Sequence, residues 1–183
     1  GEYLGSFHAR DRLLIIRESG ECYTTDFAEG IHIEDDLLRI EKYREKKLWT
    51  AVYYDADAGC DYIKRFMIDP EQKRENILGD NPQNRFLILT DTYYPRLALG
   101  RKERSGEIRM SELDVETFAL VKGIRAKGKR LANYPVVELS ELPPLKESPI
   151  IEDEEPNTST EEGEEDLFAP SDFSPEEDNA TQQ

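Results

Sequence analysis

The feature that most constrains this chain is a short apolar run that recurs along it. Four such runs, rich in β-favouring residues, lie 36, 37 and 32 residues apart and begin at Leu13, Trp49, Phe86 and Phe118. Each leads through a polar turn with Gly or Asp into a second strand-like segment, at 22–25, 62–68, 94–99 and 130–134. This order of apolar arm, tight turn and mixed return arm is typical of a β-hairpin. The sequence therefore predicts four hairpins.

The arms of these hairpins differ in character. The first arms are continuously apolar and the return arms mixed, as expected when one strand is buried on both faces and its partner lies nearer an edge. Pro95, in the third return arm, indicates an edge position. We expect segments 37–40 and 107–110 to complete sheets of three or four strands, and only 70–78 suggests a short helix or a loop. Hairpin repeats of this length predict an all-β protein of small, stacked sheets.

Charge divides the chain into two parts. The formal net charge is -16, yet residues 1–146 carry 26 acidic and 24 basic residues. Residues 147–183 carry 14 acidic residues and no Lys or Arg, with four prolines scattered among them. Such a segment cannot bury enough apolar surface to offset the entropy lost on ordering. We expect one domain over 1–142 and an acidic, disordered tail over 143–183.

Several functional classes lack support in the sequence. No apolar run approaches the 18 residues of a membrane span, and no secretory signal opens the chain. The chain does not begin with Met, so we expect it to be processed or cut from a longer protein. Two cysteines favour a reducing, cytoplasmic setting. No metal-ligand spacing, catalytic nucleophile or phosphate loop is recognisable, so we expect no cofactor and no active site.

The strongest charge feature is the segment 122–130, in which five of nine residues are basic and none is acidic. Its cations are Lys122, Arg125, Lys127, Lys129 and Arg130. Cations displayed on a hairpin can neutralise phosphates without reading bases, and the two glycines can let the backbone approach a ligand. Lysines also protect exposed strand edges from pairing, and charge alone does not separate these readings. We expect corresponding positions of other units to share one basic rim, with Lys64, Arg65 and Arg96.

The residue pattern of the repeats is similar to that of a known protein family. Segment 13–23, an apolar strand leading through a polar-Gly turn into a second strand, resembles the repeated blade motif of the gyrase A and topoisomerase IV A subunits. Residues 86–91 repeat the first half of that motif, and 127–131 resemble the Lys- and Gly-rich element of the last blades. Residues 1–48 further resemble the topoisomerase A subunits of Bacteroidetes-type bacteria. The resemblance covers roughly residues 1–140.

This resemblance implies a C-terminal β-pinwheel, a propeller-like disc of hairpin blades whose basic rim binds and bends duplex DNA. With three to four units, a partial disc is expected. The resemblance places the catalytic residues and Mg²⁺ elsewhere in a type IIA topoisomerase, with ATP bound by the B subunit that partners the A-subunit dimer. The seven-residue box with which gyrase wraps DNA is not evident, which favours a topoisomerase IV-like domain. The alternative is a β-repeat protein-interaction module with an acidic regulatory tail.

The tail generates a first prediction. We expect deletion of residues 147–183 to tighten DNA binding, most visibly at low salt, because 14 acidic residues can compete with DNA for the same cations. Gel-shift titrations of the full and the shortened chain at two salt concentrations measure this effect. Equal affinities at low salt would exclude the competition.

Overall fold

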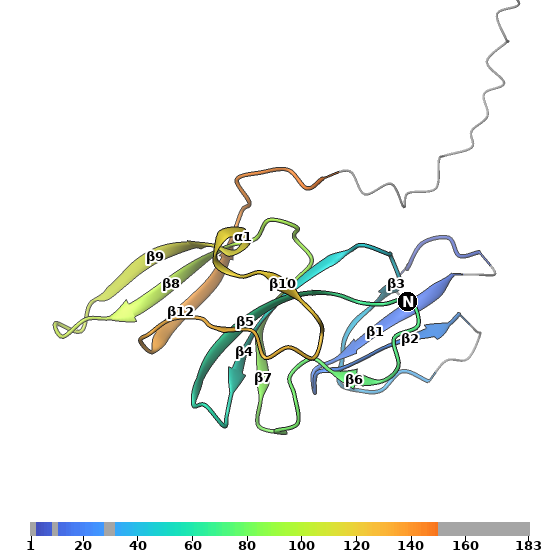
Figure 1. Cartoon of the computed structure of the whole chain (residues 1–183), viewed down its shortest axis with the longest axis horizontal. Helices are drawn as coiled ribbons and strands as arrows, with labels where there is room; N and C mark the ends of the chain where they lie inside the picture. Colours follow the sequence, from blue (N-terminus) through green and yellow to red (C-terminus); the bar gives the residue numbers. More distant parts are fainter. Residues whose placement is uncertain (1–2, 9–10, 28–31, 150–183) are drawn as a thin grey trace, which may run out of the picture. The chain divides into compact units, whose positions relative to one another are not determined.

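The computed structural model describes residues 3–8, 11–27 and 32–149. Over these ranges the chain forms twelve β-strands and one short helix, arranged in three sheets (Figure 1). The predicted all-β fold of repeated hairpin units is confirmed, while a pinwheel disc stays a prediction. Most of the predicted acidic tail, 150–183, lies outside the described residues. Among the described helices, none has the length and apolarity needed to cross a membrane.

Sheet A has the strand order β3-β1-β2-β6. Strands β1 (Arg12–Arg17) and β2 (Glu21–Asp26) pair antiparallel, which confirms the first predicted hairpin. Strand β3 (Leu37–Lys42) pairs with β1, so segment 37–40 does complete the unit. The short strand β6 (Glu75–Asn76) joins β2 from the other side, although it comes from much later in the chain.

Sheet B has the order β10-β5-β4-β7, and β11 also pairs with β5. Strands β4 (Leu48–Asp55) and β5 (Cys60–Met67) confirm the second predicted hairpin. Strand β7 (Arg85–Thr90) completes the sheet beside β4. The two-residue strands β10 (Val121–Lys122) and β11 (Lys129–Arg130) lie against β5.

Sheet C has the order β12-β8-β9. Strands β8 (Arg96–Lys102) and β9 (Ile108–Asp114) form its hairpin, and β12 (Val136–Leu142) pairs with β8. The single turn of helix α1 (Val115–Phe118) follows β9 directly, and the Asp114 side chain caps it by accepting a hydrogen bond from a backbone N–H of its first turn.

The three sheets follow one connection rule. Each contains a hairpin, and a third strand pairs with the first arm: β3 with β1, β7 with β4, and β12 with β8. In the second and third units, the chain pairs with the return arm of the preceding hairpin before it forms that third strand. We call this pairing the reach-back. Thus β6 pairs with β2, and β10 and β11 pair with β5. Neighbouring units are therefore joined by backbone hydrogen bonds as well as by side-chain packing.

Segment 69–78 shows how this reach-back works. The Thr24 hydroxyl donates to the Pro70 carbonyl at 2.7 Å, and the Ile77 N–H donates to the Gly20 carbonyl at 2.8 Å. Gly20 has a φ of +93°, and a Cβ there would lie 2.3 Å from the Asn76 side-chain oxygen. Both the turn and the close approach of β6 require glycine at this position.

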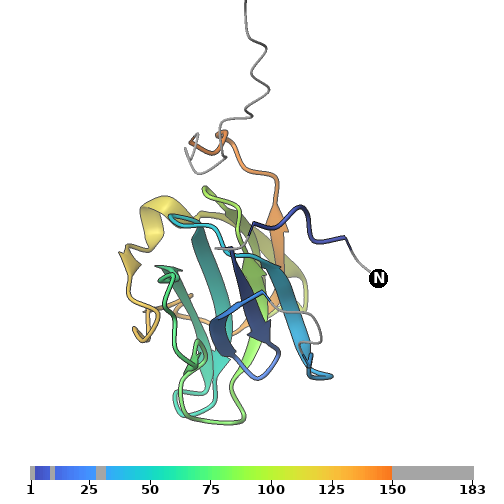
Figure 2. The same ribbon diagram turned by 90° about the vertical axis from the view of Figure 1, so that its right-hand side faces the viewer.

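Two hydrophobic cores lie on opposite faces of sheet B. One unites Trp49 and Phe66 with side chains of sheet A such as Ile16. The other unites Val52 and Ile63 with side chains of sheet C and its connections, namely Leu97, Leu99, Val115, Ala119 and Leu131. Both strands of the second hairpin thus contribute to both cores. This explains the continuous apolar character of β4, and it places sheet B between the other two (Figures 1 and 2).

The predicted third hairpin is wrong. Strands β7 and β8 do not pair with each other, because β7 joins β4 in sheet B and β8 joins β9 and β12 in sheet C. The connection between them, 91–95, crosses from one sheet to the next. Segment 107–110 correspondingly belongs to the return arm of the true third hairpin. Pro95 lies just before β8, the central strand of its sheet, so its edge assignment is also wrong; outside the ladder its missing N–H costs no hydrogen bond.

The predicted fourth hairpin is wrong as well. Its first arm contains Phe118 at the end of helix α1, and its return arm begins with β11, which pairs with β5. The cap at Asp114 starts a helical turn where an apolar run favoured a strand. The candidate helix at 70–78 is a connection that carries β6.

The reach-back rule generates a stability prediction. We expect Gly20→Ala to lower the free energy of unfolding by about 1–3 kcal/mol, because the side chain strains the backbone and collides with Asn76. Gly59→Ala is the matched control, since Gly59 also has a positive φ, +67°, with no atom within 4 Å of the added Cβ. Urea unfolding of both variants measures the difference. Equal losses would contradict a specific role of the β2–β6 contact.

Candidate nucleic-acid interface

The basic segment 122–130 lies against β5, the return arm of the second hairpin. Lys122 of β10 pairs in parallel register with Phe66, and Lys129 of β11 pairs in antiparallel register with Ile63. The chain therefore reverses direction between the two short strands while staying over β5. We call this segment the basic loop; its cations are Lys122, Arg125, Lys127, Lys129 and Arg130.

Gly128 brings the basic loop closest to β5. Its φ is +87°, and a Cβ there would lie 2.2 Å from the Ile63 carbonyl oxygen. No L side chain fits this position without moving the backbone. The glycines of this segment were expected to admit a ligand; Gly128 instead admits the protein's own strand, whereas Gly123 faces open space.

Lys64 lies beneath the loop and holds it. Its side chain is buried, with 4 % of the residue exposed, and its Nζ donates to the carbonyls of Ile124 at 2.8 Å and Ala126 at 3.1 Å. The ammonium also lies over the rings of Tyr53 and Phe66. Burial disfavours the charged form and lowers the pKa of Lys64 from 10.5 to about 8.

A third loop carbonyl is held in the same way. The Tyr53 hydroxyl donates to the Lys127 carbonyl at 2.5 Å. With three carbonyls bound from below, the polar backbone of the loop faces β4 and β5. The cationic side chains are left at the surface, where the side chains of Arg125 and Lys127 are 82 % and 54 % exposed.

The exposed cations are positioned but not buried. Three of them are tethered to acceptors on neighbouring elements: Arg125 to Glu75 at 2.7 Å, Lys127 to Asp55 at 3.3 Å, and Lys129 to the Phe118 carbonyl at 3.2 Å. The hydrogen bond from Arg125 lowers the pKa of Glu75, so this pair stays charged. The side chains of Lys122 and Arg130 have no hydrogen bond or ion pair to another described residue. Because the Arg125 side chain is exposed, its pair with Glu75 contributes little stability, and a phosphate can replace Glu75 as its partner.

Two predicted interface residues lie in the interior instead. Lys64 supports the basic loop, and Arg65 is equally buried, with 4 % exposed. Arg65 donates to the carbonyls of Ala119 at 3.1 Å and Tyr93 at 3.3 Å. Neither side chain can reach a phosphate in this fold, so we remove both from the expected rim. In the sequence they stand in a mixed return arm, where nothing shows that a later loop covers them.

Arg96 is placed at the end of sheet C. Its Nε donates to the Pro143 carbonyl at 3.1 Å, and its Nη1 contacts Glu112 at 3.0 Å. Its side chain is 21 % exposed, and its polar contacts with described residues are to β9 and to the chain leaving β12, not to the basic loop. The structure therefore does not group Arg96 with the loop cations.

Two arginines that the sequence reasoning missed extend the surface. Arg85 lies over the ring of Tyr54 at 4.6 Å, and Arg101 lies over Tyr134 at 5.0 Å. A pocket of about 290 Å³ is lined by Tyr54, Arg85, Arg130 and Tyr134 together. The positively charged surface of the basic loop therefore extends to arginines of sheets B and C that lie over tyrosine rings. Arg85 stands directly opposite Tyr54 in the ladder, a relation that became visible only once β7 was placed beside β4.

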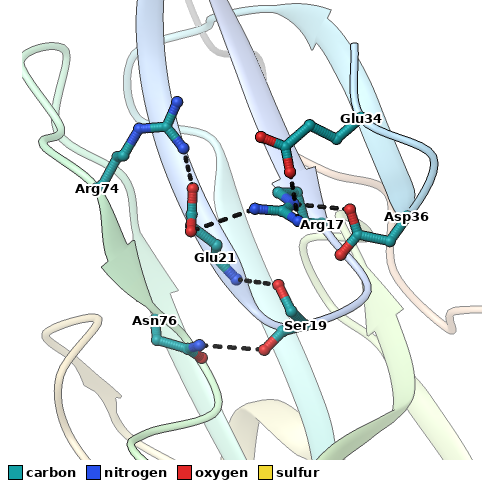
Figure 3. Close-up of polar contacts among 7 residues, drawn as sticks. All are labelled: Arg17, Ser19, Glu21, Glu34, Asp36, Arg74 and Asn76. Atoms are coloured by element: carbon teal, nitrogen blue, oxygen red, sulfur yellow. Dashed lines mark hydrogen bonds and ion pairs between the residues drawn. The ribbon is translucent and has the colours of Figure 1, made fainter. Parts of the chain in front are cut away.

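Sheet A offers a contrast, because its cations are neutralised by carboxylates. Arg17 contacts Glu21, Glu34 and Asp36, and Arg74 contacts Glu21 as well (Figure 3). The hydrogen bond from Arg17 lowers the pKa of Asp36. Other cations near β1 and β4 are also paired: Arg12 with Asp26, and Lys47 with Glu41 and Asp91. In the basic loop, by contrast, Arg125 and Lys127 have one carboxylate partner each, and the side chains of Lys122 and Arg130 have none among the described residues.

The support of the loop by Lys64 generates a pH prediction. Between pH 8 and 10.5 the unfolded chain holds a proton on Lys64 that the folded protein has released, so this residue makes the free energy of unfolding rise with pH across that window. We expect the Cε resonance of Lys64 to titrate with a midpoint near pH 8 in NMR spectra. A midpoint above pH 10 would contradict the burial of a charged amine.

The variant Lys64→Met checks the same point by stability. Because methionine cannot titrate, the difference in unfolding free energy between the parent protein and the variant should grow in favour of the parent between pH 7.5 and 9.5. Urea unfolding at the two pH values measures it, and other groups that titrate in this range cancel in the comparison. A constant difference would mean that Lys64 is not desolvated.

Comparison with known proteins assigns the family. The comparison with curated proteins finds no match to this chain. The family model described as "Topoisomerase C-terminal domain, Bacteroidota" matches residues 1–143, which include all three sheets and the basic loop. The chain belongs to this family of topoisomerase C-terminal domains.

Proposed function

We propose that this chain is a non-catalytic domain that binds and bends duplex DNA for a type IIA topoisomerase A subunit. One observation carries the proposal: the basic loop turns its carbonyls inward onto Lys64 and Tyr53 and leaves five cationic side chains at the surface. Loop carbonyls that faced solvent would place partial negative charge beside those cations. The loop itself carries no carboxylate, so its own exposed charges are all positive, although Arg125 and Lys127 also contact Glu75 and Asp55 of neighbouring elements.

The charge distribution supports this assignment. Residues 117–137 contain five basic residues and no acidic one, although residues 1–146 are nearly neutral. Lysine and arginine contacts to phosphate release condensed counterions, which supplies affinity that falls steeply with salt and does not depend on base sequence. Tyrosine rings beneath Arg85, Arg101 and Lys127 hold these cations at defined positions. The surface therefore suits a phosphate backbone better than a single small anion.

The proposed mechanism is mechanical. Bending 20–30 base pairs through 40–90° costs on the order of 1–6 kcal/mol, which a few phosphate contacts can offset. A bent duplex held near the cleavage core would bias which crossing the parent enzyme passes. We place the catalytic steps and Mg²⁺ in other parts of that enzyme, with ATP on the B subunit, and its action on cytoplasmic chromosomal DNA. Whether the activity is that of gyrase or of topoisomerase IV is a property of the whole parent enzyme.

Gel-shift titration with random duplex DNA at two salt concentrations tests the proposal. We expect binding with a steep salt dependence. Lys122→Gln should weaken binding to all sequences alike and lower the salt slope by about one, because one phosphate contact is lost. Lys46→Gln is the matched control: it removes an exposed cation from the turn between β3 and β4, outside segment 122–130. Absence of DNA binding at low salt would reject this function in favour of a protein-interaction module.

A further inference from the structure

We propose that the β8–β9 hairpin is a second DNA-contacting element, a two-stranded ribbon whose tip enters the major groove. The inference rests on the proposed function, because it names a further part of the same interface. The tip, defined as residues 101–109, carries four cations and two carboxylates: Arg101, Lys102, Arg104 and Arg109 against Glu103 and Glu107. It lies outside the segment 122–130 that dominated the sequence pattern.

The hairpin extends beyond the core that supports it. Leu97 and Leu99 of β8 are buried in the core shared with sheet B, and Gly100 is buried after them. From Arg101 onward β8 is exposed, and every residue of β9 except Leu113 is exposed. Figure 1 shows the turn between the two strands lying apart from the other sheets. Strand β12 pairs with β8 as far as Arg101, so the hairpin is two-stranded beyond the Arg101–Arg109 rung, where a ligand can contact both of its faces.

The arrangement of charges on the ribbon destabilises the free hairpin. Arg101 and Arg109 stand directly opposite each other in the ladder, where side chains of like charge repel. Neither forms an ion pair with a described residue, and the same is true of Lys102 and Arg104. Carboxylates surround Arg17 in sheet A, and no described carboxylate plays that part here (Figure 3). An external polyanion would relieve the repulsion.

The ribbon also joins the basic loop. Arg101 lies over the ring of Tyr134, and the Tyr134 hydroxyl is 3.5 Å from the Ser111 hydroxyl of β9. Tyr134 lines the same pocket as Arg130, the last cation of the basic loop. A duplex that contacts the loop would therefore be led past Tyr134 onto the hairpin.

Groove entry also accounts for two exposed apolar side chains, one in the tip and one directly after it. Ile108 and Met110 are 43 % and 48 % exposed, and both lie on the face of β9 opposite Arg109. The major groove of B-DNA, about 12 Å wide, admits a two-stranded ribbon and offers apolar contacts beside its flanking phosphates. Arginines on one face and apolar residues on the other match these two surroundings. The Gly106 turn, with a φ of +87° and no atom within 4 Å of an added Cβ, leaves the tip narrow.

Three variants of the full chain test the ribbon by gel shift at low and high salt. Arg109→Thr should weaken DNA binding about fivefold to tenfold at low salt and reduce the salt slope by about one. Its thermal midpoint without DNA should be equal to or above that of the parent, because a like-charge pair is removed. Arg109→Lys should retain binding. Arg104→Ser, in the turn outside the ladder, should weaken binding with no change in stability.

A duplex whose major groove is filled by glucosylated 5-hydroxymethylcytosine separates groove entry from phosphate contact alone. The parent should bind it more weakly than ordinary DNA, and Arg109→Thr should discriminate less. Parent-like binding by both Arg109→Thr and Arg104→Ser, or equal affinity of the parent for the two duplexes, would overturn the ribbon while Lys122→Gln still reports on the basic loop. Weakened binding by Arg109→Thr together with a lower thermal midpoint, and parent-like binding by Arg104→Ser, would also overturn it. Failure of the parent to bind any DNA would reject the proposed function itself.

Discussion

The return arm of each hairpin in sheets A and B is covered by backbone that arrives from the following unit, and the rest of the molecule depends on this pairing. Strand β6 satisfies the outer edge of β2, and strands β10 and β11 satisfy that of β5. Without these short strands, both edges would expose unpaired N–H and C=O groups. The same pairing places the basic loop, because its two ends are the strands that cover β5. Stability and candidate function therefore share one set of hydrogen bonds.

Sequence reasoning succeeded where pairing is local and failed where it is not. The first two hairpins could be predicted because a Gly-containing turn joins two adjacent strands in each. Strand β7 pairs with β4, which begins 37 residues earlier, and no turn signal records that contact. Strands β10 and β11 are two residues long, too short for any periodicity to show. The apolar run at Phe118 misled because it crosses from the end of helix α1 into β10: Ala119 is buried, whereas Leu120 and Val121 are exposed.

The candidate site was predictable in its outer residues and not in its support. A run of five cations without an acid was visible in the sequence, and all five lie exposed, either on short strands or tethered to a neighbour. Lys64 and Arg65 are cations like those of the basic loop, yet they are buried. Both lie under segments that come 54 to 62 residues later in the chain. Side-chain charge alone cannot distinguish a cation that meets a ligand from one that meets a buried carbonyl. Only the long-range contact decides.

Burying a lysine beneath a cationic loop needs a physical explanation, since both desolvation and repulsion act against it. Carbonyl dipoles at 2.8 and 3.1 Å and the faces of two aromatic rings supply negative potential without introducing a full negative charge. A carboxylate in place of Lys64 could not donate to the loop carbonyls, and its negative charge would reduce the positive potential above it. A lysine that is held by dipoles organises the loop and leaves the field of the exposed cations intact. Burial lowers the pKa of Lys64, because these dipoles and rings do not fully replace the water that a charged amine loses.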